Sequence, residues 1–230
     1  DLAMGFAEPF GGGPQAEIAG LWHDLGKYAT DFQAMLSAAS TAGERSEAHV
    51  EKEEETGAKR RVDHSTAGAF YVAERDGAHG LPMAFAIAGH HAGLADWPQL
   101  LDRFRDRGQA RLAAALAESP PSNILTHDVP TLPARLLPSA KRDVDAWRRV
   151  DLFTRMVFSA LCDADFLDTE AFCDATRPGL RGGHANLAEL APRLRAHVDG
   201  LTKHGTEVNR VRAEVRVACG ISASRAPGIH

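Results

Sequence analysis

The chain has 230 residues, of which 44% are hydrophobic and 25% charged, as is typical of soluble globular proteins. No apolar run approaches the ~20 residues that span a bilayer, so the composition argues against an integral membrane protein. The formal net charge of −5 excludes a protein that holds DNA through overall positive charge, and any contact with nucleic acid must therefore be local.

Helical periodicity runs through nearly the whole chain. Apolar residues recur at three- and four-residue steps from Ile18 to Tyr28, which predicts a helix that opens after Pro14. Further helices are predicted at 65–75 with Ser65 as N-cap, at 82–91, 99–117 and 145–172, and at about 185–203 and 206–219. No alternating β-branched run indicates a strand. The predicted fold class is all-α, a helical bundle.

Two inserts interrupt the predicted helices. The first, at about 43–61, is rich in charge and is expected to be mobile. The second, at about 118–143, contains too many prolines to be one continuous helix. We expect one domain over residues 1–204, followed by a terminal helix and a linker at 205–230.

The cysteines and the first residues bear on the compartment. The three cysteines are odd in number and lack CxxC spacing, which favours a reducing compartment and predicts a cytoplasmic protein. The chain begins "DLAMGFAEPF", with neither an initiator Met nor a signal-peptide pattern. We therefore expect it to be a piece of a longer protein.

The stretch "LWHDLGKYATDFQ" at 21–33 carries the first candidate site. On one continuous helix, Lys27 is four residues from His23 and three from Asp24, so the three side chains would share a face. A second His-Asp pair, His127-Asp128, lies among prolines with no other candidate residue nearby. The dipeptide alone is therefore no evidence of a site.

Two later segments supply histidines. His64 in "VDHSTAG" stands at a predicted helix start, where the neighbouring Ser65 could bind an anion such as phosphate. His90 and His91 end the apolar segment "AIAGHHAGL". Burial of two imidazoles there without partners would cost free energy, which suggests that they bind something.

The segment "FSALCDADFLDTE" at 158–170 places three aspartates in a mostly apolar helix. Adjacent carboxylates repel one another unless a cation neutralises at least one of them. Asp163 and Asp165 point about 200° apart on a helix, since each residue turns by ~100°, so only one of them should face a given site.

Each of these features also has an ordinary explanation. A single buried histidine is more often a hydrogen-bonded core residue, and acidic side chains on a helix are more often solvated. The basic clusters at 59–61, 103–111 and 148–149 could contact nucleic acid, but each is more often simply a solvated surface. Together, however, the His and Asp residues of four helices suit first-row transition metals such as Fe, Mn, Co or Ni. No cysteine joins the set, which argues against zinc bound by thiolates.

The ordered series "HDLGKYATDFQ", "DHSTAG", "GHHAGL" and "DADFLDTE" resembles the HD-type nuclease domain of the CRISPR type I effector nuclease-helicase, over essentially the whole chain. The resemblance implies an HD-domain bundle with two divalent transition-metal ions. The implied ligands are His23, Asp24 and Asp165 for one ion and His64, His90 and His91 for the other, with Asp24 bridging the two.

The resemblance assigns further roles. Asp165 is preferred to Asp163 because the family's aspartate directly precedes an aromatic residue, as in "ADF" here, and Lys27 would stabilise the phosphate or the leaving group. One more histidine ligand is implied upstream of "DLAMGFAEPF". The segment "VRVACGISASRAPGIH" is similar to the family's linker toward a helicase domain.

The implied function is metal-dependent cleavage of single-stranded DNA in CRISPR interference, an antiviral defence. The implied partners are a helicase domain, in the same or a partner chain, and an RNA-guided surveillance complex. Two alternatives stay open: an HD-type phosphohydrolase acting on nucleotides or cyclic dinucleotides, and a helical interaction module whose histidines pack or bind a structural ion.

Overall fold

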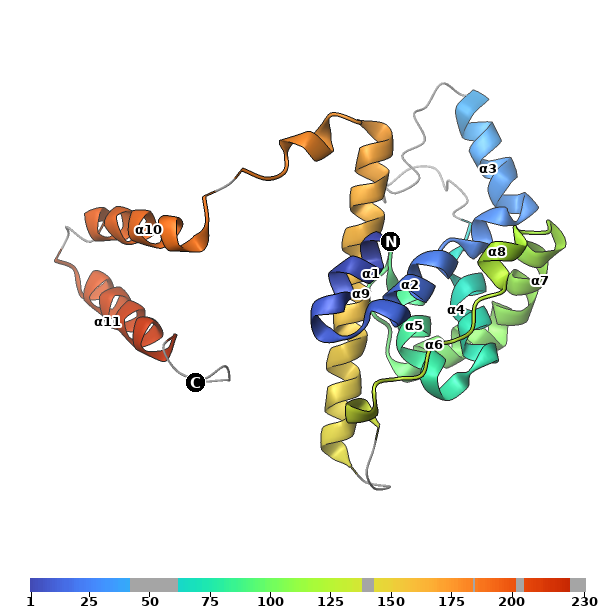
Figure 1. The fold of residues 1–230 in the computed structure, drawn as a ribbon, viewed down its shortest axis with the longest axis horizontal. Coiled ribbons are helices and arrows are strands. Elements are labelled where there is room, and N and C mark those ends of the chain that lie inside the picture. The colour runs from blue at the N-terminus through green and yellow to red at the C-terminus, as the bar shows by residue number, and fades with distance from the viewer. Residues whose placement is uncertain (42–61, 138–142, 184, 202–204, 224–230) are drawn as a thin grey trace. The chain divides into compact units, whose positions relative to one another are not determined.

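The computed structural model of the chain describes residues 1–41, 62–137, 143–183, 185–201 and 205–223. These residues form helices and no strand, which confirms the all-α prediction (Figure 1). The chain divides into two compact units, Asp1–Ala175 and Thr176–His230. This division lies before residue 204, where the sequence predicted a domain boundary. The predicted boundary remains a prediction. The charge-rich insert at 43–61 lies outside the described residues.

The first unit contains most of the helices. Its α-helices are α1 (Leu2–Ala7), α2 (Gly13–Trp22), α3 (Thr30–Thr41), α4 (Ser65–Arg75), α5 (Gly77–Gly89), α6 (Trp97–Arg103), α7 (Gln109–Ala117), α8 (Ser122–Leu125) and α9 (Val144–Cys173). Short 3-10 turns occupy Glu8–Phe10, Leu25–Tyr28 and Ala134–Leu136, and a π-helical turn at Phe104–Gly108 joins α6 to α7.

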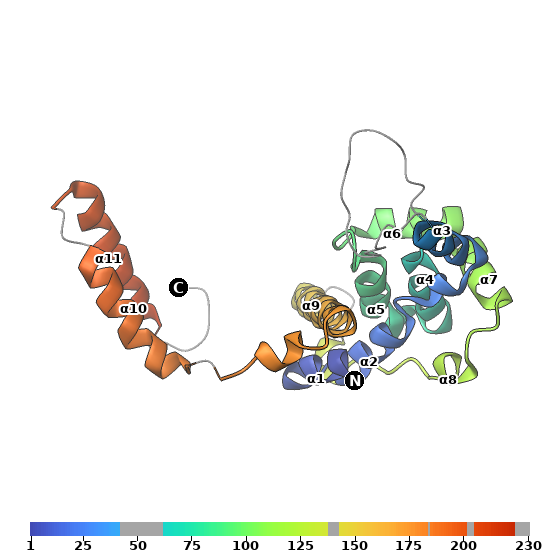
Figure 2. The same ribbon diagram turned by 90° about the horizontal axis from the view of Figure 1, so that it is seen from above.

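The 30-residue helix α9 is the longest element, and it starts where the Asp143 side chain accepts a hydrogen bond from the Ala146 amide. Its buried face carries Phe153, Val157 and Leu161, and it packs against α1, α2 and α5. Figure 2 shows α9, α5, α4 and α7 side by side in that order, in agreement with the contacts between neighbours. Helix α2 contacts α9, α5 and α4, and so brings its C-terminal end against the middle of this row.

Helix α2 ends earlier than its apolar periodicity predicted. It stops at Trp22, and the chain then turns through Asp24 into the 3-10 turn Leu25–Tyr28. At this end α2 approaches another backbone closely, because a Cβ on Gly68 of α4 would lie 1.8 Å from the Trp22 carbonyl oxygen. Trp22 is fully buried, and its indole Nε1 donates to the Ile124 carbonyl over 2.7 Å. The prediction of one continuous helix to residue 28 is therefore wrong.

The starts of α4 and α5 are set by aspartates. Helix α4 begins at Ser65, but Ser65 is not its N-cap as predicted. The Asp63 carboxylate instead accepts from the backbone amide of Thr66, three residues on, as a capping side chain does. Helix α5 begins five residues before the predicted start because Asp76 caps it by accepting from the Ala78 and His79 amides.

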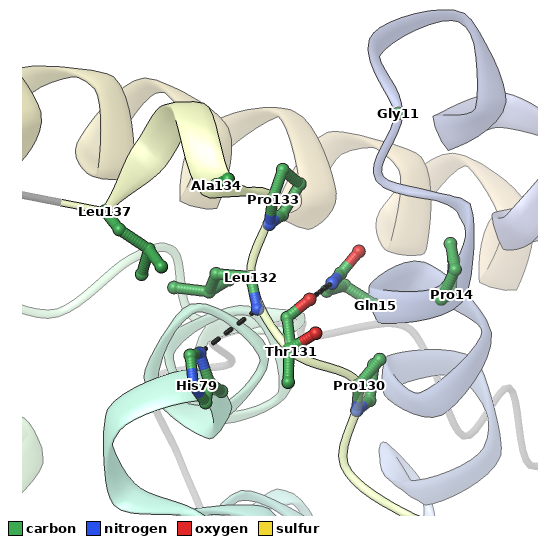
Figure 3. A pocket seen from close by; sticks show the side chains of 10 residues that line it. All are labelled: Gly11, Pro14, Gln15, His79, Pro130, Thr131, Leu132, Pro133, Ala134 and Leu137. Carbon is green, nitrogen blue, oxygen red and sulfur yellow. Dashed lines mark hydrogen bonds between the residues drawn. The ribbon is translucent and has the colours of Figure 1, made fainter.

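The Pro-rich segment forms no continuous helix, as predicted, and Figure 3 shows two of the hydrogen bonds that tie it to the bundle. The Gln15 amide Nε2 donates to the Thr131 carbonyl, and the Leu132 amide donates to His79 Nδ1. An open cavity of about 680 Å³ lies along this segment, and none of the predicted metal ligands lines it. Residues 138–142 of this segment lie outside the described part of the chain.

The second unit contains the 3-10 turn Arg177–Leu180, α10 (Leu187–Leu201) and α11 (Glu207–Ser222). No residue described in α10 or α11 is buried. Arg216 of α11 donates to the Asp199 carboxylate of α10 over 2.5 Å. No helix within the described ranges is both long and apolar enough to cross a membrane.

Candidate metal centre

Four separate segments bring the predicted ligands together in the first unit. His23 and Asp24 lie in the turn after α2, and His64 directly precedes α4. His90 and His91 follow the last residue of α5. Asp165 lies on α9, about two turns before that helix ends. All six residues are at least partly buried, and the His90 side chain is fully buried.

The ligand atoms form two overlapping groups, each with all its atoms within 4.8 Å of one another. One group consists of Asp24, His64, His90 and His91, and the other consists of His23, His90 and Asp165. Asp24 also lies beside the second group, since its Oδ2 is 3.2 Å from His23 Nε2. Asp24 therefore lies between the two groups, where a bridging carboxylate would have to be.

The spacing within the groups suits metal coordination. His23 Nε2 is 3.4 Å from Asp165 Oδ1, and Asp24 Oδ1 is 3.6 Å from His64 Nε2 and 4.0 Å from His90 Nε2. Two donor atoms at ~2.1 Å from one ion lie about 3.0 Å apart at a right angle and about 4.2 Å apart on opposite sides. The observed separations fall between these limits.

Backbone carbonyls orient two of the imidazoles. His23 Nδ1 donates to the Gly20 carbonyl over 2.8 Å, and His90 Nδ1 donates to the Ile87 carbonyl over 2.7 Å. A carbonyl oxygen can only accept, so Nδ1 carries a proton in both rings, and Nε2 is the atom left to face the centre. Metal-binding histidines are commonly fixed in this way through the other ring nitrogen.

Several buried atoms of the centre make no hydrogen bond to the described residues. They are the Nε2 atoms of His23, His64 and His90 and the Oδ1 atom of Asp24. Such atoms are nearly always satisfied in folded proteins, because each unsatisfied one costs free energy. The centre therefore has the buried, convergent and unused donor atoms that a bound cation requires.

The electrostatics of the centre favour a cation. Burial lowers the pKa of His23, but the carboxylates of Asp165 and Asp24 outweigh burial and raise that pKa to about 10. Burial alone would raise the pKa of Asp24, yet His23 and Lys27 hold it well below its usual range. Burial, with help from His23 and His91, lowers the pKa of His90 to about 3. The Asp24 carboxylate is therefore ionised and His90 is neutral and able to bind a metal, while His23 carries a second proton that a bound ion would displace.

Two further side chains border the centre. Lys27 Nζ lies 2.7 Å from Asp24 Oδ2, across a turn and not along a helix face as predicted. The Cys162 thiol of α9 donates to the His90 carbonyl over 3.6 Å. Burial raises the pKa of this thiol to about 11, and Cys162 belongs to neither group of candidate ligands.

Other candidates from the sequence lie outside the two groups. Asp163 and Asp168 are exposed on α9, and the structure brings only Asp165 among the α9 aspartates to the histidines. His127 and Asp128 belong to neither group. Ser65 is buried, and its hydroxyl accepts from Arg103 over 2.6 Å, so it is not open to a phosphate.

Arg103 was missed as a site residue, because "RFRDRGQAR" was read only as a basic surface cluster. Its side chain is 22% exposed and forms an ion pair with Asp63, next to His64. Gly26 was also given no role, yet a Cβ there would lie 2.1 Å from the His64 carbonyl oxygen. No periodic pattern in the sequence indicates either contact, so sequence reasoning could not have found them.

Comparison with known proteins agrees with this geometry. A family model described as "Cas3, HD domain" matches residues 16–170, which include all the predicted ligands. No curated protein matches the chain.

Proposed function

Since this chain belongs to the family of Cas3 HD domains, we propose that it is a metal-dependent nuclease that hydrolyses phosphodiester bonds of single-stranded DNA in CRISPR type I interference. One observation carries the proposal. The two groups of donor atoms share His90 and have Asp24 between them, and the buried Nε2 atoms of His23, His64 and His90 make no hydrogen bond to the described residues. A pair of adjacent ions explains this arrangement better than ordinary packing does.

The chain's own residues would hold the two ions. We assign His23, Asp24 and Asp165 to one ion and Asp24, His64, His90 and His91 to the other. The mixture of imidazole and carboxylate donors suits Fe, Mn, Co or Ni. When bound, two divalent ions lower the pKa of water and neutralise charge on the attacking and leaving oxygens of a phosphodiester.

Lys27 is the cation that the chain itself contributes. Its ammonium group lies 2.7 Å from Asp24, at the edge of the ligand set, and its side chain is 23% exposed. We assign it to the substrate phosphate, where a fixed positive charge stabilises the developing negative charge. The contact with Asp24 keeps the long lysine side chain beside the centre when no substrate is present.

Single-stranded DNA is the proposed substrate because of the family, and partners follow from the same source. A helicase domain, in this or a partner chain, and an RNA-guided surveillance complex would supply the separated strand. The net charge of −5 gives the chain no general affinity for DNA, so delivery by a partner fits its composition. We expect little base preference, since phosphate contacts carry no sequence information.

The proposal is tested by substrate choice. The purified chain is loaded with Mn²⁺, Co²⁺ or Ni²⁺ and incubated separately with circular single-stranded DNA, duplex DNA, mononucleotides and cyclic dinucleotides. We expect cleavage of the circular single strand, abolished by a chelator. Hydrolysis of the small nucleotides alone would show instead an HD-type phosphohydrolase.

A further inference from the structure

We infer that Arg103, the last residue of α6, is a positioning residue that holds His64 and the His90-His91 pair in place for the second metal ion; this inference rests on the proposed function. Its guanidinium group is the point where the ends of three helices meet.

On one side, Arg103 holds the residues around His64. Its Nη2 donates to Asp63 Oδ1 over 2.9 Å and to Ser65 Oγ over 2.6 Å, so one nitrogen bonds the residues before and after His64. Its Nε donates to Thr66 Oγ1 over 2.5 Å. The backbone that carries the His64 ring is thereby fixed on both sides.

On the other side, Arg103 holds the end of α5. Its Nη1 donates over 2.7 Å to the carbonyl of Ala88, two residues before His90. That carbonyl belongs to the last turn of α5, where carbonyls lack partners within the helix and a positive charge is favourable. The His90 ring is itself oriented by the adjacent Ile87 carbonyl. Arg103 therefore fixes the helix end from which both histidines project.

Charge and geometry both favour arginine here. Asp63 caps α4 through the Thr66 amide and pairs with Arg103 through the same oxygen, Oδ1. Arg107, one turn further along, reaches the other oxygen of Asp63 at 3.4 Å. A planar guanidinium can serve two segments at once in a fixed geometry, whereas the single ammonium of a lysine cannot.

The test measures metal binding, not only cleavage. The whole chain is titrated with Co²⁺, and the visible absorption of the bound ion and the number of ions bound are followed, for the parent, Arg103→Lys and the control Arg105→Lys. Arg105 is a good control because it lies in the neighbouring turn, is 72% exposed and contacts only Asp102 in the ion pairs described.

We expect Arg103→Lys to fold, to keep one ion and to bind the second about 10- to 100-fold more weakly, with altered absorption, while Arg105→Lys matches the parent. Parent-like affinity and absorption in Arg103→Lys would overturn the positioning role but leave the proposed function standing. A parent that binds no ion would instead refute the proposed function and this inference with it. If Arg103→Lys does not fold, Asp63→Asn tests the same set of contacts and should weaken the binding of the second ion. Parent-like binding in Asp63→Asn would overturn the inference.

Discussion

At the scale of single residues, the ring nitrogens of His23, His64 and His90 are the most informative atoms of the chain. Each is buried and makes no hydrogen bond to the described residues. The same is true of Asp24 Oδ1, which lies 3.6 Å from His64 Nε2 and 4.0 Å from His90 Nε2. One unsatisfied buried polar group costs about 1–3 kcal/mol. Four such atoms in one place are a substantial cost, which a bound cation would remove.

The aspartates of α9 provide a matched pair for testing the ligand set. Asp165 Oδ1 lies 3.4 Å from His23 Nε2, whereas Asp163 is exposed and belongs to neither group. Asp165→Asn removes an anionic ligand and should lower metal affinity about 10-fold or more, while Asp163→Asn should not change it. Metal content after dialysis against limiting Mn²⁺ measures the difference. Equal retention by the two variants would exclude Asp165 as a ligand.

Lys27 is expected to separate catalysis from metal binding. An ammonium beside a cation site opposes binding of the ion, so Lys27→Met should bind metal as tightly as the parent or more tightly. Loss of a charge that stabilises the transition state should lower kcat about 10²-fold. Single-turnover rates at saturating metal, set beside the binding isotherm, check both expectations. If metal affinity and rate fall together, Lys27 supports the ligands and does not act on the substrate.

At the scale of elements, two glycines let the ligand segments approach one another. The Trp22 carbonyl, which ends α2, fits against Gly68 of α4, and the turn at Gly26 fits against the His64 backbone. These contacts place His23 and Asp24 beside His64. The glycines of "HDLGK" and "HSTAG" are therefore explained by packing, without any direct role in chemistry.

Gly68 and Gly77 form a matched pair for the packing. A Cβ on Gly68 would lie 1.8 Å from a backbone oxygen, whereas one on Gly77, at the start of α5, would meet nothing within 4 Å. Gly68→Ala should lower the free energy of unfolding by about 1–3 kcal/mol or more, and Gly77→Ala should leave it unchanged or raise it by up to about 1 kcal/mol. Urea unfolding followed by circular dichroism measures both. A small effect at Gly68 would mean that α2 and α4 can separate without cost.

Sequence patterns predicted the helices better than their ends. The apolar stripe continued to Tyr28 because Leu25, in the turn, is as buried as the residues of α2, so periodicity alone could not show the break. The early start of α5 depends on a cap at Asp76, which lies outside the apolar run. Helix ends in this chain coincide with capping side chains and with contacts between distant backbone segments. Apolar periodicity reveals neither of these.

At the scale of the whole molecule, the candidate ligands are spread over 143 positions, from His23 to Asp165 of the sequence. The order of the four sequence motifs was enough to name these candidates, because their histidines and aspartates suit metal binding and each motif lies on or beside a predicted helix. The hydrogen bonds of Arg103 were not predictable. Its partners Asp63 and Ala88 lie 40 and 15 residues away in the sequence, and no periodic pattern links them to Arg103. Contacts of this kind need the three-dimensional arrangement.

Metal should stabilise the first unit as a whole, because ligands from four segments come together only in the folded state. An ion at 100 times its Kd adds about 2.7 kcal/mol to the free energy of unfolding. For a unit of this size, that amounts to a rise in Tm of about 5–10 °C. Thermal unfolding with and without Mn²⁺ measures the rise, and His90→Ala, which removes a ligand of the second ion, should reduce it. An equal rise in that variant would place the stabilising ion elsewhere.

The most direct test of the central claim is the rate at which the chain cleaves circular single-stranded DNA as Mn²⁺ is added. A metal-dependent nuclease built on these ligands should be inactive in chelator and should reach a plateau with metal. Asp24→Asn, which removes the charge between the two groups, should cut that plateau at least about 10²-fold while the fold persists. Cleavage that survives the chelator, or a plateau unchanged in Asp24→Asn, would contradict the claim.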